Sequence, residues 1–239
     1  MTSGIILCGG QSSRMGFPKA WLPFGPETML ARVGRLLAEV ANPIVVVAAA
    51  GQDLPEITRA TVVRDRRPGR GPLEGIAAGL EALAALVEGP PTQDNAAYVT
   101  SCDVPLLSPA FIRRMIELLD GHAIAVPHVG GFYHPLAAVY RTDVLADIHR
   151  LLAEDRMRPA FLFEEVDTRV VRDADLADVE SGATIAADPL ASLRNLNHPE
   201  DYFTALCDEG LDVPHDIRQA LAGVDVSEGD EPGPEVAGH

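Results

Sequence analysis

Short apolar segments and amphipathic helical segments alternate along the first half of the chain, and this alternation restricts the fold more than any other feature. Apolar runs predict strands at residues 5–8, 43–50, 61–65 and 96–103. Apolar residues at helical spacing predict helices at residues 27–41, 72–88 and 108–120. Strand–helix alternation implies parallel strands joined by right-handed crossovers. We therefore expect an α/β fold, with a doubly wound, mostly parallel sheet and helices on both faces.

The pattern loosens after about residue 120. Strands are expected at residues 123–127, 136–141 and 168–173, and helices at residues 142–154 and 198–207. No linker rich in glycine, proline or serine interrupts residues 1–207, so we expect a single domain there. Residues 208–239 form an acidic extension, and we expect disorder from about residue 224, where large apolar side chains are scarce.

The charge and the cysteines exclude several classes of protein. The formal net charge is −16, and about half of it lies after residue 207, which argues against a nucleic-acid partner. No apolar run approaches the roughly 18 residues of a membrane span. Three widely spaced cysteines without a CxxC pair indicate neither a disulfide framework nor a zinc site. We expect a cytoplasmic protein, whose sites for anions gather basic residues locally, as at positions 14, 19, 64, 66, 67 and 70.

The first predicted strand runs into the segment LCGGQSSRMGFPK, residues 7–19. Gly9 and Gly10 allow backbone N–H groups to approach phosphate oxygens, while Arg14 offers a planar fork and Lys19 a mobile positive charge. The segment lacks the GK[ST] ending of a P-loop and the GxGxxG pattern of dinucleotide-binding proteins. A glycine turn with solvated charges is the alternative, but the spacing of Arg-Met-Gly and the lysine favours phosphate binding.

The same segment resembles the LAGGxSxRMGxxK signature of nucleotidyltransferases with a GT-A-like, Rossmann-like fold. The resemblance implies transfer of a nucleoside monophosphate from an NTP to a phosphate, with release of pyrophosphate. It implies catalytic roles for Arg14 and Lys19. It also implies contact between the nucleotide and the residues Leu7, Cys8, Gly9, Gly10, Ser12, Arg14 and Lys19.

A second segment, RDRRPGRGPLEGI at residues 64–76, resembles the D…GPLxG segment of molybdenum cofactor guanylyltransferases. This resemblance implies that the nucleotide also contacts Asp65, Gly71, Pro72 and Leu73. The related cytidylyltransferases of the same cofactor pathway usually lack the Gly-Pro-Leu-x-Gly motif. A surface turn that leads into a helix is the alternative interpretation.

The segment TSCDVPLL, residues 100–107, resembles the CDxPxL segment of the same superfamily, whose aspartate binds Mg²⁺ and contacts the nucleotide. The corresponding residue is Asp103, which the resemblance also makes catalytic. A carboxylate at the carboxyl end of a buried strand lies where such sheets bind ligands, and Mg²⁺ accepts one or two carboxylates plus phosphate oxygens. A turn residue before Pro105 is the alternative role.

Two later segments extend the resemblance. NLNHPEDY, residues 195–202, resembles the NxNTPEDL ending of the guanylyltransferases, which implies that Asn195 and Asn197 complete the metal site. The two asparagines alternate along an extended segment and so share a face, although Asn197 could instead cap the helix that follows. FYHPLAAVYR, residues 132–141, is similar to the HPL-A-YR segment near the acceptor site, which implies that His134 contacts the pterin; a half-buried histidine at the end of a strand is the alternative.

The resemblance covers about residues 3–207 and implies transfer of GMP from GTP to the molybdopterin-type cofactor, with Mg²⁺ as cofactor. Proteins that deliver or accept that cofactor are expected as transient partners. Two residues depart from the family pattern: Ala48 stands where many relatives place a guanine-contacting asparagine, and Cys8 replaces the usual alanine. The alternatives are a cytidylyltransferase, a sugar-phosphate nucleotidyltransferase, or a nucleotide-binding partner without turnover.

Overall fold

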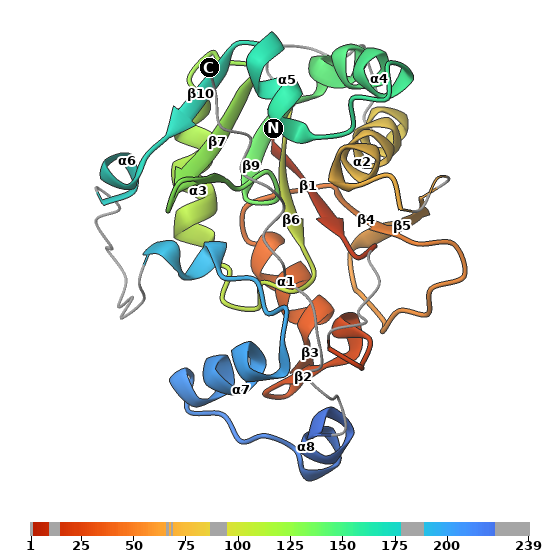
Figure 1. The fold of residues 1–239 in the computed structure, drawn as a ribbon, viewed down its shortest axis with the longest axis vertical. Coiled ribbons are helices and arrows are strands. Elements are labelled where there is room, and N and C mark those ends of the chain that lie inside the picture. Colours follow the sequence, from red (N-terminus) through yellow and green to blue (C-terminus); the bar gives the residue numbers. More distant parts are fainter. Residues whose placement is uncertain are drawn as a thin grey trace, which may run out of the picture.

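The computed structural model describes residues 2–9, 15–65, 67, 69–86, 95–177 and 189–222 (Figure 1). An eight-stranded sheet crosses the molecule, with the strand order β10-β7-β9-β6-β1-β4-β5, and β8 pairs with β7 at one end. The strands are β1 (Thr2–Leu7), β4 (Ile44–Ala48), β5 (Ala60–Arg64), β6 (Ala96–Ser101), β7 (Ile124–Val129), β8 (Phe132–Tyr133), β9 (Ala138–Arg141) and β10 (Thr168–Val171).

Most neighbouring strands of the sheet are parallel. β1 pairs in parallel with both β4 and β6, β4 with β5, and β7 with β10. β9 is antiparallel to β6 and to β7, between which it lies. The expected doubly wound, mostly parallel sheet is therefore confirmed, and β1, β4 and β6 end at the same edge.

Helices cover both faces of the sheet, and the alternation of side chains along β1 shows how. Ile6 packs in the cluster that contains Leu30, Val33 and Leu37 of α1 (Met29–Leu37) and the buried residues of α3 (Pro109–Leu119). Ile5 and Leu7 point to the opposite face, where α2 (Pro72–Leu86) and α4 (Leu145–Ala153) pack together with α5 (Pro159–Glu165). Strands buried on both faces explain why the central segments are almost wholly apolar.

α2 lies very close to β1 because glycine faces the strand. A Cβ atom placed on Gly79 would lie 2.6 Å from Cγ2 of Ile5, and one on Gly75 would lie 3.1 Å from Cδ1 of Leu7. The absence of these two side chains lets the helix seat its apolar face directly on the strand. The first turn of α2 is thereby brought to the carboxyl end of β1.

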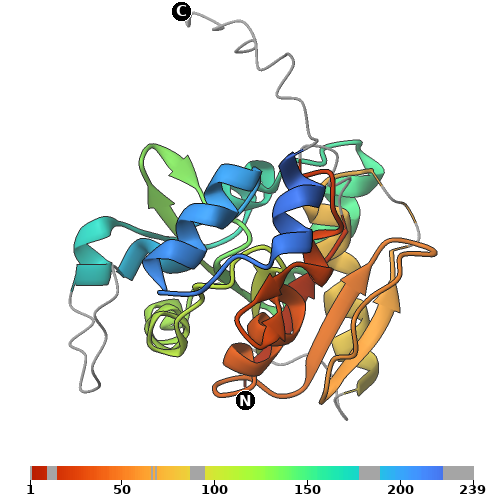
Figure 2. The same cartoon turned by 90° about the horizontal axis from the view of Figure 1, so that it is seen from below.

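A third apolar cluster lies beside the main sheet, away from both of its faces. It joins the hairpin of β2 (Pro23–Phe24) and β3 (Glu27–Thr28) to α7 (Pro199–Asp208) and α8 (His215–Ala222), which Figures 1 and 2 show side by side. Its buried members are Met15, Leu22, Phe24, Met29, Leu196, Tyr202, Ala205, Leu206, Ile217 and Leu221. The hydroxyl of Tyr202 donates a hydrogen bond to the Pro23 carbonyl, which fixes α7 to the hairpin.

Several expected boundaries differ from the structure. The helix expected at residues 27–41 begins at Met29, because Glu27 and Thr28 pair with β2 and the Thr28 hydroxyl accepts a hydrogen bond from the Ala31 N–H. The strand expected at residues 168–173 ends at Val171, because Asp173 begins the short helix α6 (Asp173–Ala177). The segment expected as one helix at residues 142–154 is a 3-10 turn, η2 (Thr142–Val144), followed by α4.

The helices α5 and α8 were not predicted from the sequence. α8 lies within the segment assigned to the acidic extension, yet its Ile217 and Leu221 are buried in the third cluster. The disorder expected from about residue 224 concerns residues outside the described part of the chain. Within that part, no helix is long and apolar enough to cross a membrane.

Candidate functional site

A pocket of about 500 Å³ opens beyond the carboxyl ends of β1, β4 and β6. Its wall combines the ends of these strands with the first turn of α2 and with the segment before α7. It is lined by Leu7, Cys8, Gly9, Lys19, Ala20, Val47, Ala49, Gln52, Asp65, Gly69, Gly71, Pro72, Gly75, Ser101, Cys102, Asp103, Leu136, Asn195 and Asn197. This is the edge at which parallel α/β sheets bind their ligands.

Lys19, Asp103 and Asn197 meet inside this pocket, although they come from three separate parts of the chain. The ammonium nitrogen of Lys19 lies 2.7 Å from Oδ2 of Asp103 and 2.7 Å from Oδ1 of Asn197. The side chains of Lys19 and Asp103 are only 15% and 14% exposed, so water screens their ion pair weakly. The two oxygen atoms thus converge on one positive charge.

Lys19 and Asp103 are each held in place by their local structure. Lys19 begins the short 3-10 helix η1 (Lys19–Trp21), whose Trp21 indole donates a hydrogen bond to the Asp53 carbonyl. Asp103 follows β6, and the Ser101 hydroxyl donates to its second carboxylate oxygen, Oδ1, at 2.5 Å.

The segment that carries the two asparagines is attached directly to the end of β6. The Leu196 N–H donates a hydrogen bond to the Asp103 carbonyl, at 2.9 Å, and the Leu196 side chain is buried in the third cluster. Asn195 and Asn197, on either side of Leu196, both line the pocket. The alternative role of Asn197 as a helix cap is not observed: α7 begins after His198, and the Asp201 carboxylate accepts from the N–H groups of residues 197 and 198.

The oxygen atoms of Asp103 and Asn197 fit a hard cation. In this structure they already share a positive charge, that of the Lys19 ammonium group, and carboxylate and amide oxygens are suitable ligands for Mg²⁺. Within the described residues, no group of three or more His, Cys, Asp or Glu side chains could hold a metal by itself. A metal bound here would therefore need oxygen atoms from its ligand, as Mg²⁺–phosphate sites do.

The carboxyl end of β1 also lines the pocket, next to the end of β6. A Cβ atom placed on Gly9 would meet nothing within 4 Å, so open space adjoins this part of the backbone. Cys8 and Cys102 lie at the ends of adjacent strands; the hydrogen bond between the two thiols, burial and the negative charge of nearby Asp103 raise the pKa of the Cys8 thiol. This thiol therefore stays protonated and is a poor nucleophile.

In the segment that leads into α2, some residues line the pocket and others are buried in the core. Asp65, Gly71 and Pro72 line the pocket, and the Asp65 carboxylate accepts a hydrogen bond from the Arg67 N–H at 2.8 Å. Leu73, expected to contact the nucleotide, does not line the pocket. Its side chain is fully buried between α2 and the sheet, because this helix turns its apolar face toward β1 as soon as it begins.

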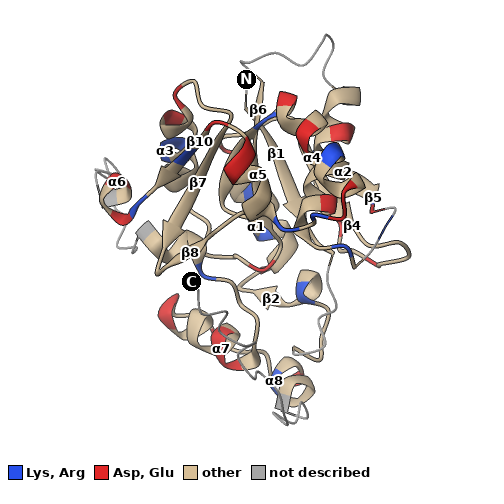
Figure 3. Cartoon of the chain, turned by 45° about the horizontal axis from the view of Figure 1, so that its top comes forward, with Lys and Arg blue, Asp and Glu red and all other residues tan. Residues whose placement is uncertain are grey.

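Among the described basic residues that were expected to gather at the site, Lys19 lines the pocket and Arg64, Arg67 and Arg70 do not. The guanidinium of Arg70 donates to the Leu152 carbonyl and pairs with Asp155, and that of Arg64 donates to the carbonyls of Ala49 and Gln52. Lys19 is the single lysine in a chain with 18 arginines. Figure 3 shows acidic residues on α5 and α7, whereas Lys19 brings a cation into the pocket. Gly10, Ser12, Arg14 and Arg66 lie outside the described residues, so their roles remain predictions.

Two polar residues of the pocket were missed by the sequence analysis. Ser101 directly precedes the Cys-Asp pair, and Gln52 is the first polar residue after the apolar run of β4. In both cases the signal was a polar side chain close to the carboxyl end of a central strand. Ala48, in contrast, is fully buried and does not line the pocket.

Comparison with known proteins gives matches over most of the chain. Residues 4–170 match the sequence family described as the MobA-like NTP transferase domain. A probable molybdenum cofactor guanylyltransferase from Mycolicibacterium paratuberculosis is 37% identical over 191 residues, which cover 77% of this chain and 93% of that protein. A protein of the same description from Pelotomaculum thermopropionicum is 31% identical over 203 residues, covering 85% of this chain and 91% of its own.

Solved structures share the fold at low sequence identity. Molybdopterin-guanine dinucleotide biosynthesis protein A from Archaeoglobus fulgidus superposes with a TM-score of 0.66 at 18% identity, over 87% of this chain and all of that one. The 2-C-methyl-D-erythritol 4-phosphate cytidylyltransferase from Thermus thermophilus gives 0.61 at 18% identity, over 88% and 100%. The manganese complex of Rv0371c from Mycobacterium tuberculosis gives 0.52 at 18% identity, over 86% and 97%.

Proposed function

This chain belongs to the MobA-like NTP transferase family, and we propose that it transfers GMP from GTP to the terminal phosphate of the molybdopterin-type cofactor, releasing pyrophosphate. Curated relatives that match over more than nine-tenths of their length are described as molybdenum cofactor guanylyltransferases, which supports this choice. The structural observation that carries the proposal is the convergence of Lys19, Asp103 and Asn197 in one pocket.

Different parts of the pocket would bind the phosphates and the nucleoside of the nucleotide. Lys19 would bind the triphosphate, since a lysine ammonium group is a mobile point charge suited to phosphate oxygens. The Gly9 and Gly10 amides, Ser12 and Arg14 would hold the phosphates from the β1 side. Asp65 would seat the nucleoside, with Gly71 and Pro72 beside it at the start of α2.

Mg²⁺ is the cofactor that fits this site. Asp103 and Asn197 would hold it, with Asn195 as a third ligand from the same wall. Bound there, the metal would offset negative charge on the phosphates. Lys19, which pairs with both oxygen ligands in this structure, would then be free to contact phosphate oxygens.

The reaction needs little covalent help from the protein. An oxygen of the acceptor phosphate attacks the α-phosphorus of GTP, and the bond between the α-phosphorus and the bridging oxygen breaks as pyrophosphate leaves. The attacking oxygen is already anionic, so no general base is required. Positioning of the phosphates and neutralisation of their charge, by Lys19 and Arg14 directly and by Asp103 through the metal it would hold, are therefore the main contributions of the chain.

We propose that the protein acts in the cytoplasm, with transient contacts to proteins that deliver or accept the cofactor. Cys8, Cys102 and Cys207 are all free thiols, which is consistent with a reducing compartment. The high negative charge supports small anionic substrates held in a local site rather than nucleic acid.

A nucleotide screen tests the proposed function. Pyrophosphate release is followed with GTP, CTP, ATP and UTP, each with molybdopterin as acceptor, and then with sugar phosphates in place of molybdopterin. We expect release with GTP and molybdopterin, and none from the Asp103→Asn variant. Preference for CTP would indicate a cytidylyltransferase, preference for a sugar phosphate would indicate a different acceptor, and no release with any pair would indicate a binding protein.

A further inference from the structure

Where β1 and β4 reach the pocket, a side chain replaces one of the backbone hydrogen bonds between the two strands. Along a parallel pair the hydrogen bonds follow at even intervals. The Cys8 N–H donates to the Val47 carbonyl at 2.8 Å, so the next bond of the series would run from the Ala49 N–H to the Cys8 carbonyl. Instead, the side-chain carboxamide of Gln52 takes that place.

Both ends of this carboxamide are used. The Ala49 N–H donates to Oε1 of Gln52 at 3.0 Å, and Nε2 of Gln52 donates to the Cys8 carbonyl at 3.0 Å. The side chain therefore satisfies one donor and one acceptor that the strands would otherwise satisfy directly. Because it is inserted between them, it holds the carboxyl ends of β1 and β4 further apart than a direct bond would.

The backbone that carries this side chain is also fixed. The Gln52 N–H donates to the Ala49 carbonyl at 3.1 Å, and the Arg64 guanidinium donates to the Gln52 carbonyl at 2.7 Å and to the Ala49 carbonyl at 3.2 Å. The carboxamide thus starts from a backbone that is bound on two sides. A side chain held in this way can hold its partners in turn.

The bond to the Cys8 carbonyl has a consequence for Gly9. The carbonyl of residue 8 and the N–H of residue 9 belong to one planar trans peptide unit, so they point in opposite directions. Since Gln52 binds the carbonyl on the β4 side, the Gly9 N–H faces the β6 side, where Asp103 follows the strand. Cys8, Gly9, Ala49 and Gln52 all line the pocket.

We propose that Gln52 is a positioning residue for the nucleotide: its carboxamide keeps the ends of β1 and β4 apart and orients the Gly9 N–H toward the triphosphate. This inference rests on the proposed function. Gln52 acts through the Cys8–Gly9 peptide, so its removal should weaken nucleotide binding.

Two substitutions separate the hydrogen bonds from the space that the side chain fills. Gln52→Met keeps the length of the side chain but can neither donate nor accept in this geometry. Gln52→Glu keeps the shape; as a carboxylate it cannot donate to the Cys8 carbonyl, whereas as a neutral acid it can both donate and accept. Gln219→Met is the matched control, because Gln219 is exposed on α8.

The experiment is calorimetric titration with Mg·GTP, together with the melting temperature of each protein. We expect Gln52→Met to bind Mg·GTP about tenfold more weakly, which corresponds to a loss of ~1.4 kcal/mol of binding free energy. Gln219→Met should bind like the wild type. For Gln52→Glu, the affinity is expressed relative to the wild type at each pH, because the triphosphate itself titrates. This ratio should be about one tenth at pH 8 and should rise as the pH falls toward 4, because a carboxyl group with an ordinary pKa of about 4.3 then becomes protonated.

The outcomes distinguish the inference from its premise. Binding within twofold of the wild type by Gln52→Met, or a Gln52→Glu ratio that stays constant with pH, overturns the role of Gln52. If Gln52→Met fails to fold, the pH dependence of Gln52→Glu decides the question alone. Failure of the wild type to bind Mg·GTP would instead overturn the proposed function.

Discussion

The ammonium nitrogen of Lys19 lies 2.7 Å from a carboxylate oxygen of Asp103, across 84 residues of sequence. The pair unites the segment after β1 with the end of β6, and Asn197 adds the segment before α7 to the same point. The polar centre of the pocket is thus built from three distant parts of the chain. Each of its members can be changed without altering the apolar core beneath it.

Asp103→Asn should abolish nucleotidyl transfer while the fold is retained. The substitution keeps the size of the side chain but removes the negative charge that would hold the metal and that pairs with Lys19. We expect the rate of pyrophosphate release to fall at least ~100-fold, which is typical for loss of an electrostatic group at a reacting centre. The melting temperature should change by only a few degrees, and a rate close to that of the wild type would remove Asp103 from the mechanism.

Lys19→Met should weaken binding of Mg·GTP by roughly 10- to 100-fold, the value of one charge-assisted hydrogen bond. Arg113→Met, which removes an equal charge from an exposed position on α3, is the control and should bind normally.

Because Lys19 is the single lysine, reductive methylation with ¹³C-formaldehyde labels one side chain plus the amino terminus. The lysine signal in NMR spectra should shift when Mg·GTP is added. An unchanged affinity in Lys19→Met, or an unchanged lysine signal on saturation with nucleotide, would contradict a role for Lys19 in phosphate binding.

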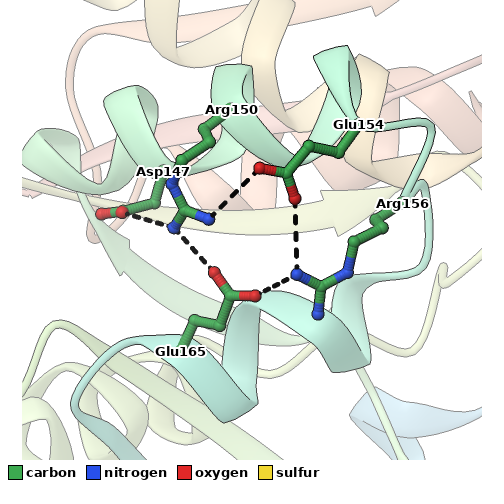
Figure 4. Close-up of polar contacts among 5 residues, drawn as sticks. All are labelled: Asp147, Arg150, Glu154, Arg156 and Glu165. Carbon is green, nitrogen blue, oxygen red and sulfur yellow. Dashed lines mark hydrogen bonds and ion pairs between the residues drawn. The ribbon is translucent and has the colours of Figure 1, made fainter.

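The ion-pair network that joins α4 to α5 should make part of the stability pH-dependent (Figure 4). Glu165 pairs with Arg150 at 2.7 Å and also with Arg156, and hydrogen bonds from these two arginines lower the pKa of the Glu165 carboxyl. Its contribution is therefore full above the pKa of the unfolded chain, about 4.3, and is lost as the pH falls through the lower pKa of the folded state.

Glu165→Gln tests this network. The urea midpoint of the variant should lie below that of the wild type at pH 7, and the difference should be smaller at pH 3, because the wild-type carboxyl becomes protonated as the pH falls through its lowered pKa. The same difference at both pH values would show that the side chain acts through packing rather than charge. The shift should be small, since exposed ion pairs contribute little.

Gly79→Ala should destabilise the protein even though alanine favours helices. The new methyl group would lie 2.6 Å from Cγ2 of Ile5, and such overpacking costs about 1–3 kcal/mol, against a gain of about 1 kcal/mol in helix propensity. We expect a net loss of about 1 kcal/mol and a melting temperature lower by roughly 2–4 °C.

Ala84→Gly, at an exposed position of the same helix, calibrates the propensity difference and should itself cost about 0.5–1 kcal/mol. An increase in stability on Gly79→Ala would show that α2 does not approach β1 as closely as described.

The central strands and the position of Asp103 could be predicted because apolar patterning reports burial directly. β1, β4 and β6 are buried along almost their whole length, and a carboxylate just after such a strand lies at the edge where the sheet binds ligands. The pairing of Asp103 with Lys19 then follows only once the strand order is known. Sequence spacing alone does not fix which side chains meet.

Other features depend on directions and contacts that a residue pattern does not contain. The segment of β9 reads like any apolar strand, and its antiparallel direction follows from the connections on either side of it. Leu73 belongs to a motif that crosses from the pocket into a helix, so its neighbours face the ligand while it faces the core. Gln52 was missed because its role depends on one ladder hydrogen bond that the backbone does not make.

The third cluster, which contains Met15, has a consequence for how activity is lost on heating. Met15 and Leu196 are both fully buried in it, four residues before Lys19 and one residue before Asn197. If this cluster unfolds before the sheet does, as peripheral units of proteins often do, the Lys19 ammonium group and the Asn197 side chain separate while β1 and β6 stay paired. Inactivation would then precede global unfolding, and ligands that bridge Lys19 and Asn197 would protect the enzyme from heat by holding α7 and the β2–β3 hairpin in place.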